Sequence, residues 1–343
     1  MGIVKLLAMV RPFDLRDMTL IRRLGERGVS LHTASALAEN FHPLRGALRS
    51  MLVGGEFPTF VWKPENGDRA GFIQLRIANG ATQAHVLYIS PRCGDDEHVP
   101  AANGSDVLRS RDCAIWLALL DEAVAGVGAR GIQHVIAEVD ERSDELVVLR
   151  RAGFAVYTRQ DIWLVRAPEY RPLGIAARPI ARRAPVDEWD IQLLYANTVP
   201  RLVQLVEPLP ATGDGEGWVV RHGDELAAFV SMRRGAVATW LRFFIYPDAE
   251  AEADEIVAAA LEVAFADEPE LVYCCVRRYE SWLPGALERA GFGVCSSQAV
   301  MVRHTVHHAA RPMPETVVAL EGQRVSASSP IVRTFRRPKH KVE

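Results

Sequence analysis

Apolar and polar positions follow each other along this chain in a pattern that occurs twice. The segment LRRAGFAVYTRQDIWLV at 149–165 returns 138 residues later as LERAGFGVCSSQAVMVR at 287–303. In each copy, apolar residues lead to arginine and then to a glycine, which is typical of the end of a helix. Apolar and polar residues then alternate, as in a strand. Each copy therefore predicts a helix that ends before Gly153 or Gly291 and a strand that follows it.

The same spacing extends upstream of this repeated segment. Apolar residues at helical spacing over 116–127 precede a strand pattern over 132–139. At the same offset, helical spacing over 256–265 precedes a strand pattern over 271–276. Because a helix and a strand recur without a gap, we predict that each half of the chain builds the same unit.

Two hairpins precede these helices. Alternating runs are joined by Asn-Gly at 66–67 and by Gly-Asp at 223–224, which are strong turn signals. A third strand pattern follows each hairpin and stops at Pro91 or Pro247. Each half therefore has the predicted order strand, helices, three antiparallel strands, helix, strand, helix, strand.

The length of the chain and the positions of its prolines suggest how it divides into domains. A chain of 343 residues is long enough for two domains. Two prolines interrupt the pattern within APEYRPLG at 167–174, and the periodicity fades after about residue 305. We predict an α/β (α+β) protein with an N-terminal domain at 1–167, a C-terminal domain at 168–305, and an extension at 306–343 that includes a partly disordered basic tail.

Composition narrows the function classes. The net charge is −3, which argues against nucleic-acid binding over the whole surface. No apolar run approaches the roughly 18 residues of a membrane span, so we expect a cytoplasmic protein that does not enter a membrane. The five cysteines include no C-x-x-C pair, and His304, His307 and His308 have no partner motif. We expect free thiols and no metal.

The chain resembles two tandem domains of the GNAT superfamily of acyl-CoA-dependent N-acyltransferases. The resemblance rests on the order of elements, on the hairpin sequence WVVRHGDELAAF and on the repeated motif LxxAGF. The resemblance covers the chain up to about residue 305. It implies a splayed, mixed and mostly antiparallel sheet flanked by helices. It also implies an acyl-CoA, such as acetyl-CoA, where the fourth and fifth strands part, and an amine acceptor that is a small molecule or a peptide.

In that family, backbone N–H groups of a glycine-rich loop and of the next helix bind the CoA pyrophosphate. The second half has DAEAEADE at 248–255 in this place, with five carboxylates and no glycine. These charges would oppose a pyrophosphate, while they suit the first turn of an unliganded helix. The second site is therefore predicted to be closed to CoA.

The first half has a longer loop at 92–115, and two arginines arrive just before the helix. The glycine pattern is missing here too. These two arginines can therefore be interpreted equally well as solvent-exposed loop charges or as ligands of the CoA pyrophosphate. If this half binds acetyl-CoA, the resemblance places the cofactor on the end of the fourth strand and on this loop. The cofactor-binding candidates are Tyr88, Ile89, Ser90, Arg109, Arg111 and Ala114.

No catalytic residue is assigned. The family's tyrosine would stand at positions that are Leu149 and Leu287 here. Tyr88, Glu138 and Tyr157 are possible substitutes, although strand packing explains them more simply. Two interpretations remain open. We favour an acyltransferase in the first half beside a degenerate second half. The alternative is a catalytically silent GNAT-fold binding or scaffold protein that has lost CoA. The oligomeric state is not predicted.

Overall fold

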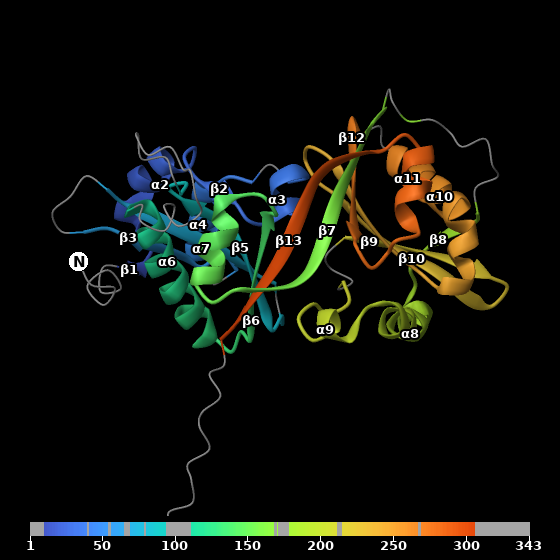
Figure 1. Ribbon diagram of the computed structural model, residues 1–343, viewed down its shortest axis with the longest axis horizontal. Coiled ribbons are helices and arrows are strands. Elements are labelled where there is room, and N and C mark those ends of the chain that lie inside the picture. Colours follow the sequence, from blue (N-terminus) through green and yellow to red (C-terminus); the bar gives the residue numbers. More distant parts are fainter. Residues whose placement is uncertain are drawn as a thin grey trace, which may run out of the picture. The chain divides into compact units, whose positions relative to one another are not determined.

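The computed structural model describes residues 10–39, 41–53, 56–64, 69–78, 80–93, 111–167, 170, 178–210, 215–266 and 269–305. The strands of this part of the chain form one 13-stranded sheet (Figure 1). Its order is β1-β3-β4-β5-β6-β13-β7-β12-β11-β10-β9-β8, with β2 paired to β5. All neighbours in this order are antiparallel except β5 with β6 and β11 with β12, so the sheet is mixed and mostly antiparallel.

The first half contains β1 (Val10–Pro12), the 3-10 helix η1 (Leu15–Asp17), α2 (Met18–Leu24), β2 (Val29–Ser30), α3 (Thr33–Leu37), α4 (Pro43–Val53), β3 (Thr59–Trp62), β4 (Gly71–Ile77), β5 (Gln83–Ser90), α6 (Arg111–Gly128), β6 (His134–Asp140), α7 (Asp144–Arg151) and β7 (Ala155–Arg166). The predicted order of elements is confirmed for this half. The short strand β2 is an addition that the sequence pattern did not predict.

The second half contains β8 (Ile180–Arg182), the 3-10 helix η3 (Pro185–Asp187), α8 (Glu188–Thr198), α9 (Arg201–Gln204), β9 (Glu216–His222), β10 (Glu225–Arg234), β11 (Thr239–Ile245), the 3-10 helix η4 (Pro247–Glu252), α10 (Ala253–Phe265), β12 (Leu271–Arg277), α11 (Leu283–Arg289) and β13 (Gly293–His304). It repeats the order of strands of the first half without a counterpart of β2, with two α-helices in place of three before the hairpin, and with η4 as an addition among the described residues.

The repeated phrase ends a helix in both halves, as predicted. Gly153 follows α7 with φ +84°, and Gly291 follows α11 with φ +92°. Glycine is favoured at both places because a side chain strains this left-handed backbone. The next residue of each copy, Phe154 or Phe292, then donates its backbone N–H back into the last turn of the helix.

The last strand of each half pairs with the other half. β13 lies between β6 and β7, and β7 in turn pairs with β12 (Figure 1). The long strands β7 and β13 therefore join the two halves into one sheet. The domain bounds at 1–167 and 168–305 stay a prediction, and the extension at 306–343 lies outside the described residues.

Helices cover both faces of this sheet. On one face, the cores below α6 and α7 and below α10 and α11 include Trp116 and Leu261. On the other face, α2 and α4 pack around Phe72, and α8 and α9 pack around Phe229. In the part of the chain that the structure describes, no helix is long and apolar enough to cross a membrane.

Candidate functional site

The first parallel strand pair opens into a split. β5 and β6 are paired only from Gln83 to His85 and from His134 to Ile136, and beyond these residues they part. The resemblance implies a splayed sheet at this place, between the fourth and fifth strands of the unit. The backbone edge of β5 beyond His85 is where the resemblance puts the cofactor.

The short strand β2 occupies this split. Val29 and Ser30 pair with the end of β5. The next residue, Leu31, donates its backbone N–H to Leu87 O at 3.0 Å and accepts the N–H of Glu138 at 2.8 Å. Leu31 is 1% exposed. The backbone at 29–31 therefore links β5 to β6 through the edge that an acyl-CoA would use.

Three of the predicted cofactor residues take part in this arrangement. Tyr88 and Ile89 pair with β2 through their backbone. The Tyr88 hydroxyl donates to Gly25 O at 2.7 Å and accepts the N–H of Gly28 at 2.8 Å. The Ser90 hydroxyl donates to the last residue of α2 at 2.8 Å. Their cofactor role stays a prediction, and β2 would have to leave for it.

Two of the other cofactor candidates, Arg111 and Ala114, lie at the beginning of α6. Arg111 is the first residue of this helix and is exposed, and Ala114 is half-buried. Trp116 Nε1 donates to Pro91 O at 2.6 Å, which holds α6 against the end of β5. Arg109 lies outside the described residues. The proposed phosphate contact of Arg111 and Ala114 stays a prediction.

In the second half, carboxylates at the beginning of α10 are paired with cations of the same chain. Arg178 lies 2.7 Å from both Glu252 and Glu255. Asp254 lies 2.7 Å from Arg289 of α11. These ion pairs stabilise the helix start without an external ligand, and their carboxylates would repel a pyrophosphate.

Beyond the second split, a buried carboxylate lies between two arginines. β11 and β12 are paired only over residues 239–241 and 272–274. Next to this pairing, Glu207 Oε1 accepts from Arg277 Nη2 at 2.5 Å, and Glu207 Oε2 lies 3.4 Å from Arg242 Nη1. Tyr157 also donates to Glu207. Burial raises the pKa of Glu207, but the two guanidinium groups and the tyrosine outweigh it and hold this pKa at about 2.

A cavity of about 360 Å³ connects the two splits. Its walls come from both halves and include His85, Glu138, Trp240, Arg242, Cys275 and Arg277. Burial lowers the pKa of His85 and of His32, which also lines the cavity, so both rings are neutral near pH 7. The fixed charges of the cavity are therefore those of its arginines and glutamates.

Sequence reasoning named Glu138 but missed Glu207, Arg242 and Arg277. Two of these stand inside apolar strand patterns, as WLRFFIY and as LVYCCVR. A charged residue in such a run is costly to bury unless it has a partner of opposite charge. An arginine within an apolar strand pattern was therefore the signal that could have indicated a buried ion pair. Glu207 follows α9 in an irregular segment, so no pattern marked it.

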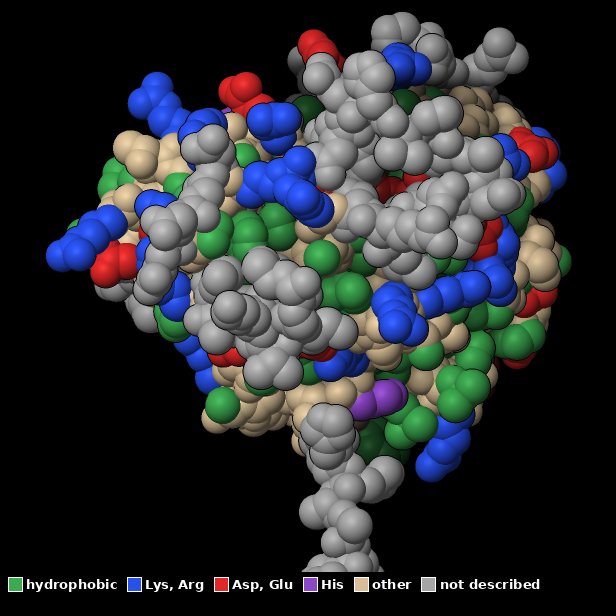
Figure 2. All heavy atoms as spheres, turned by 60° about the vertical axis from the view of Figure 1, so that its left-hand side comes forward, with side chains coloured by type: hydrophobic (Ala, Val, Ile, Leu, Met, Phe, Trp, Pro, Cys, Tyr) green, Lys and Arg blue, Asp and Glu red, His purple; other side chains and the backbone are tan. Residues whose placement is uncertain are grey.

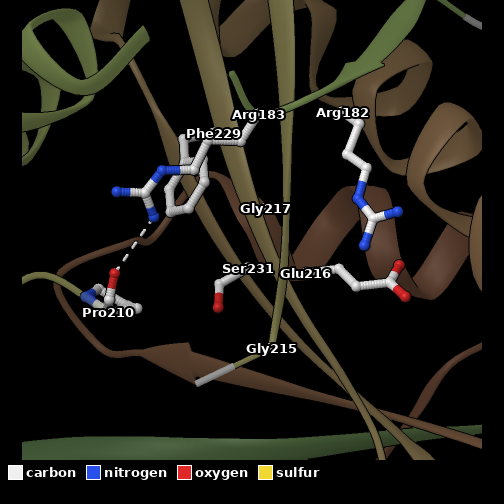
Figure 3. Close-up of a pocket in the computed structure, with 8 residues that line it drawn as sticks. All are labelled: Arg182, Arg183, Pro210, Gly215, Glu216, Gly217, Phe229 and Ser231. Carbon is white, nitrogen blue, oxygen red and sulfur yellow. Dashed lines mark hydrogen bonds between the residues drawn. The ribbon is translucent and has the colours of Figure 1, made fainter. Parts of the chain in front are cut away.

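A smaller pocket of about 120 Å³ lies at β9 and β10 (Figure 3). The Arg183 guanidinium lies over the Phe229 ring at 5.5 Å and donates to Pro210 O at 3.4 Å. It also pairs with Glu188 at 2.5 Å. The charge of Arg183 is thus satisfied within the protein, and the larger cavity is the better candidate site.

On the face shown in Figure 2, Lys and Arg side chains lie at several separate places, with Asp and Glu side chains between them. Among the residues that the structure describes, no three His, Cys, Asp or Glu side chains are grouped to hold a metal ion.

No protein-family model and no curated protein matches the sequence. Solved structures do match the fold. A GCN5-related N-acetyltransferase from Sphaerobacter thermophilus is 13% identical with a TM-score of 0.51, over 86% of this chain and 95% of that one. A tandem GNAT protein from the clavulanic acid biosynthesis pathway is 14% identical with a TM-score of 0.52, over 87% and 98%.

A third match is a GCN5-related glucosamine N-acetyltransferase region of a fungal multi-domain GH3 β-N-acetylglucosaminidase. It is 13% identical with a TM-score of 0.52, over 86% of this chain and 38% of that one. Identities this low show the fold alone. The chain has the fold of the GNAT N-acetyltransferases, and the predicted fold class is confirmed.

Proposed function

We propose that this chain is a catalytically silent GNAT-fold binding protein. Neither half binds the acyl-CoA for which this fold has a site in acetyltransferases. The observation that carries the proposal is the backbone of Leu31. It accepts from Glu138 and donates to Leu87, at 2.8 and 3.0 Å, and so closes the split of the first half.

Opening this split has a substantial free-energy cost. Two backbone hydrogen bonds contribute about 1 kcal/mol each, and exposing a buried leucine costs about 2 kcal/mol. A ligand that displaces β2 must offset roughly 4 kcal/mol, which corresponds to a loss of affinity of about 1,000-fold. Acyl-CoA would therefore bind the first half weakly.

The second half is closed by charge. Glu252, Asp254 and Glu255 stand where the pyrophosphate would sit, and each already has an arginine partner within the chain. A pyrophosphate would have to break these pairs and approach the freed carboxylates. Neither half therefore favours the acyl donor.

The second candidate function is acyl transfer in the first half, from acetyl-CoA to a small-molecule or peptide amine. The fold of the matching acetyltransferases and the split between β5 and β6 favour it. It requires β2 to move out of the split. Arg111 at the beginning of α6 would then lie near the bound pyrophosphate.

Thermal unfolding of the full chain with acetyl-CoA separates the two candidates. A ligand at 100 times its Kd stabilises a protein by about 2.7 kcal/mol, so binding at micromolar Kd would raise Tm by several degrees at 1 mM. We expect no rise. A rise that Arg111→Glu abolishes, and that Arg151→Glu at the exposed end of α7 preserves, would show that the first half binds acetyl-CoA and would favour the acyltransferase instead.

A further inference from the structure

We propose that the cavity between the two splits binds the carboxylate group of a small organic acid through Arg242 and Arg277. The inference goes beyond the proposed loss of acyl-CoA binding and does not depend on it. It rests on the walls of the cavity and on the hydrogen-bonding state of these two arginines.

Both arginines have donors that no described residue uses. Arg277 is 3% exposed and donates from Nη2 to Glu207 at 2.5 Å. Among the described residues, no acceptor lies in hydrogen-bond reach of Arg277 Nε, Arg277 Nη1 or Arg242 Nη2, and all three atoms are buried. Buried donors of a charged group are costly when they lack an acceptor, so these atoms favour a ligand that supplies one.

Arg242 and Arg277 also have one carboxylate partner between them among the described residues. Two guanidinium groups share the single carboxylate of Glu207. The nearby Glu280 accepts from the backbone N–H of Arg277 at 2.8 Å rather than from its guanidinium group. An anion therefore satisfies the free donors better than a neutral acceptor does.

The rest of the cavity indicates what kind of anion fits. Glu138 and Glu207 both line it, so a phosphate dianion would meet two carboxylates, whereas a carboxylate brings one charge. Trp240, Leu209 and Ala34 supply apolar wall for an organic part. The volume of about 360 Å³ lies at the lower end of the range of about 300–1,000 Å³ that small-molecule sites occupy.

The test uses the full chain and benzoate as the probe, with benzamide as its neutral analogue. Binding is followed by NMR through the Nε–H signals of Arg242 and Arg277 and by calorimetry. We expect benzoate to shift both signals in a saturable way and benzamide to bind at least tenfold more weakly. Arg242→Gln should weaken benzoate at least tenfold, because it removes a charged donor.

Arg278→Gln is the matched control. Arg278 follows Arg277 directly, but it is exposed and pairs with Glu141 at 2.6 Å and Asp161 at 3.4 Å. It should bind benzoate like the unchanged chain, and both variants should first be shown to melt cooperatively. The proposal is overturned if neither benzoate nor acetate shifts the two signals, if benzamide binds equally well, or if inorganic phosphate binds more tightly. Acetyl-CoA in the same assay tests the proposed loss of acyl-CoA binding, and its result leaves the carboxylate proposal unaffected.

Discussion

Gln160 donates a hydrogen bond to Gln298 at 2.8 Å, and these two residues hold the same position in the two copies of the repeat. They are also register partners in the β7–β13 pair. Residues at equal distances on either side, such as Asp161 with Ser297 and Arg159 with Ala299, are partners as well. The repeat in the sequence therefore corresponds to a local two-fold relation whose axis passes between the two glutamines.

Replacing Gln298 by leucine should destabilise the chain by about 1–3 kcal/mol, because buried donors lose their acceptor. Gln298 Oε1 accepts from Gln160 Nε2 and from Thr33 Oγ1, both at 2.8 Å. Urea unfolding measures the change. Arg159→Gln, at an exposed neighbour on β7, is the control and should change stability by less than about 0.5 kcal/mol. If Gln298→Leu leaves the free energy of unfolding unchanged, the contact between the two glutamines does not stabilise the sheet.

Gly28→Ala should loosen β2. A Cβ at Gly28 would lie 2.4 Å from both Ile89 O and the Tyr88 ring, so the backbone must shift. We expect a loss of about 1–3 kcal/mol and faster amide hydrogen exchange at Leu31. Gly293→Ala is the matched control, because its Cβ would meet open space. Equal exchange in both variants would contradict the tight fit of β2.

Glu207→Gln should destabilise the chain by about 3–5 kcal/mol, since it leaves the buried guanidinium group of Arg277 and the partly buried one of Arg242 without their carboxylate partner. Adding Arg242→Gln should recover at least about 1 kcal/mol, because it removes one of the uncompensated charges. A double-mutant cycle by chemical unfolding measures this coupling. Additive losses would mean that Glu207 and Arg242 do not interact.

The contribution of Glu280 to stability should fall as pH rises from about 4.5 to 7. Burial raises the pKa of this carboxyl from 4.5 to about 7, against the pull of Arg242 and a backbone hydrogen bond. The folded chain then holds its proton at pH values where the unfolded chain has lost it, so the contribution is complete below the unfolded pKa and is lost by about pH 7.

Glu280→Gln removes this titration. The variant should be more stable than the unchanged chain at pH 8 by about 1–3 kcal/mol and should differ little at pH 4. If Glu280→Gln is less stable at pH 8, the carboxylate of Glu280 is ionised and satisfied in the folded chain.

The sequence predicted the repeated order of elements because each helix end and each hairpin has its own local signal, as at Gly153 and Gly223. It could not predict that β13 inserts between β6 and β7, since strand pairing across 138 residues leaves no local trace. β2 has only two residues, too few for an alternating pattern. The cluster around Glu207 was missed because its members come from three distant segments.

We infer that the protein's own backbone at Leu31 fills the first split in place of acyl-CoA. Amide hydrogen exchange of the full chain tests it most directly, read at Leu31 and Glu138 with and without 1 mM acetyl-CoA. We expect strong protection of both amides and no change on adding acetyl-CoA. Weak protection in the free chain, or a saturable increase of exchange at both amides with acetyl-CoA, would contradict it.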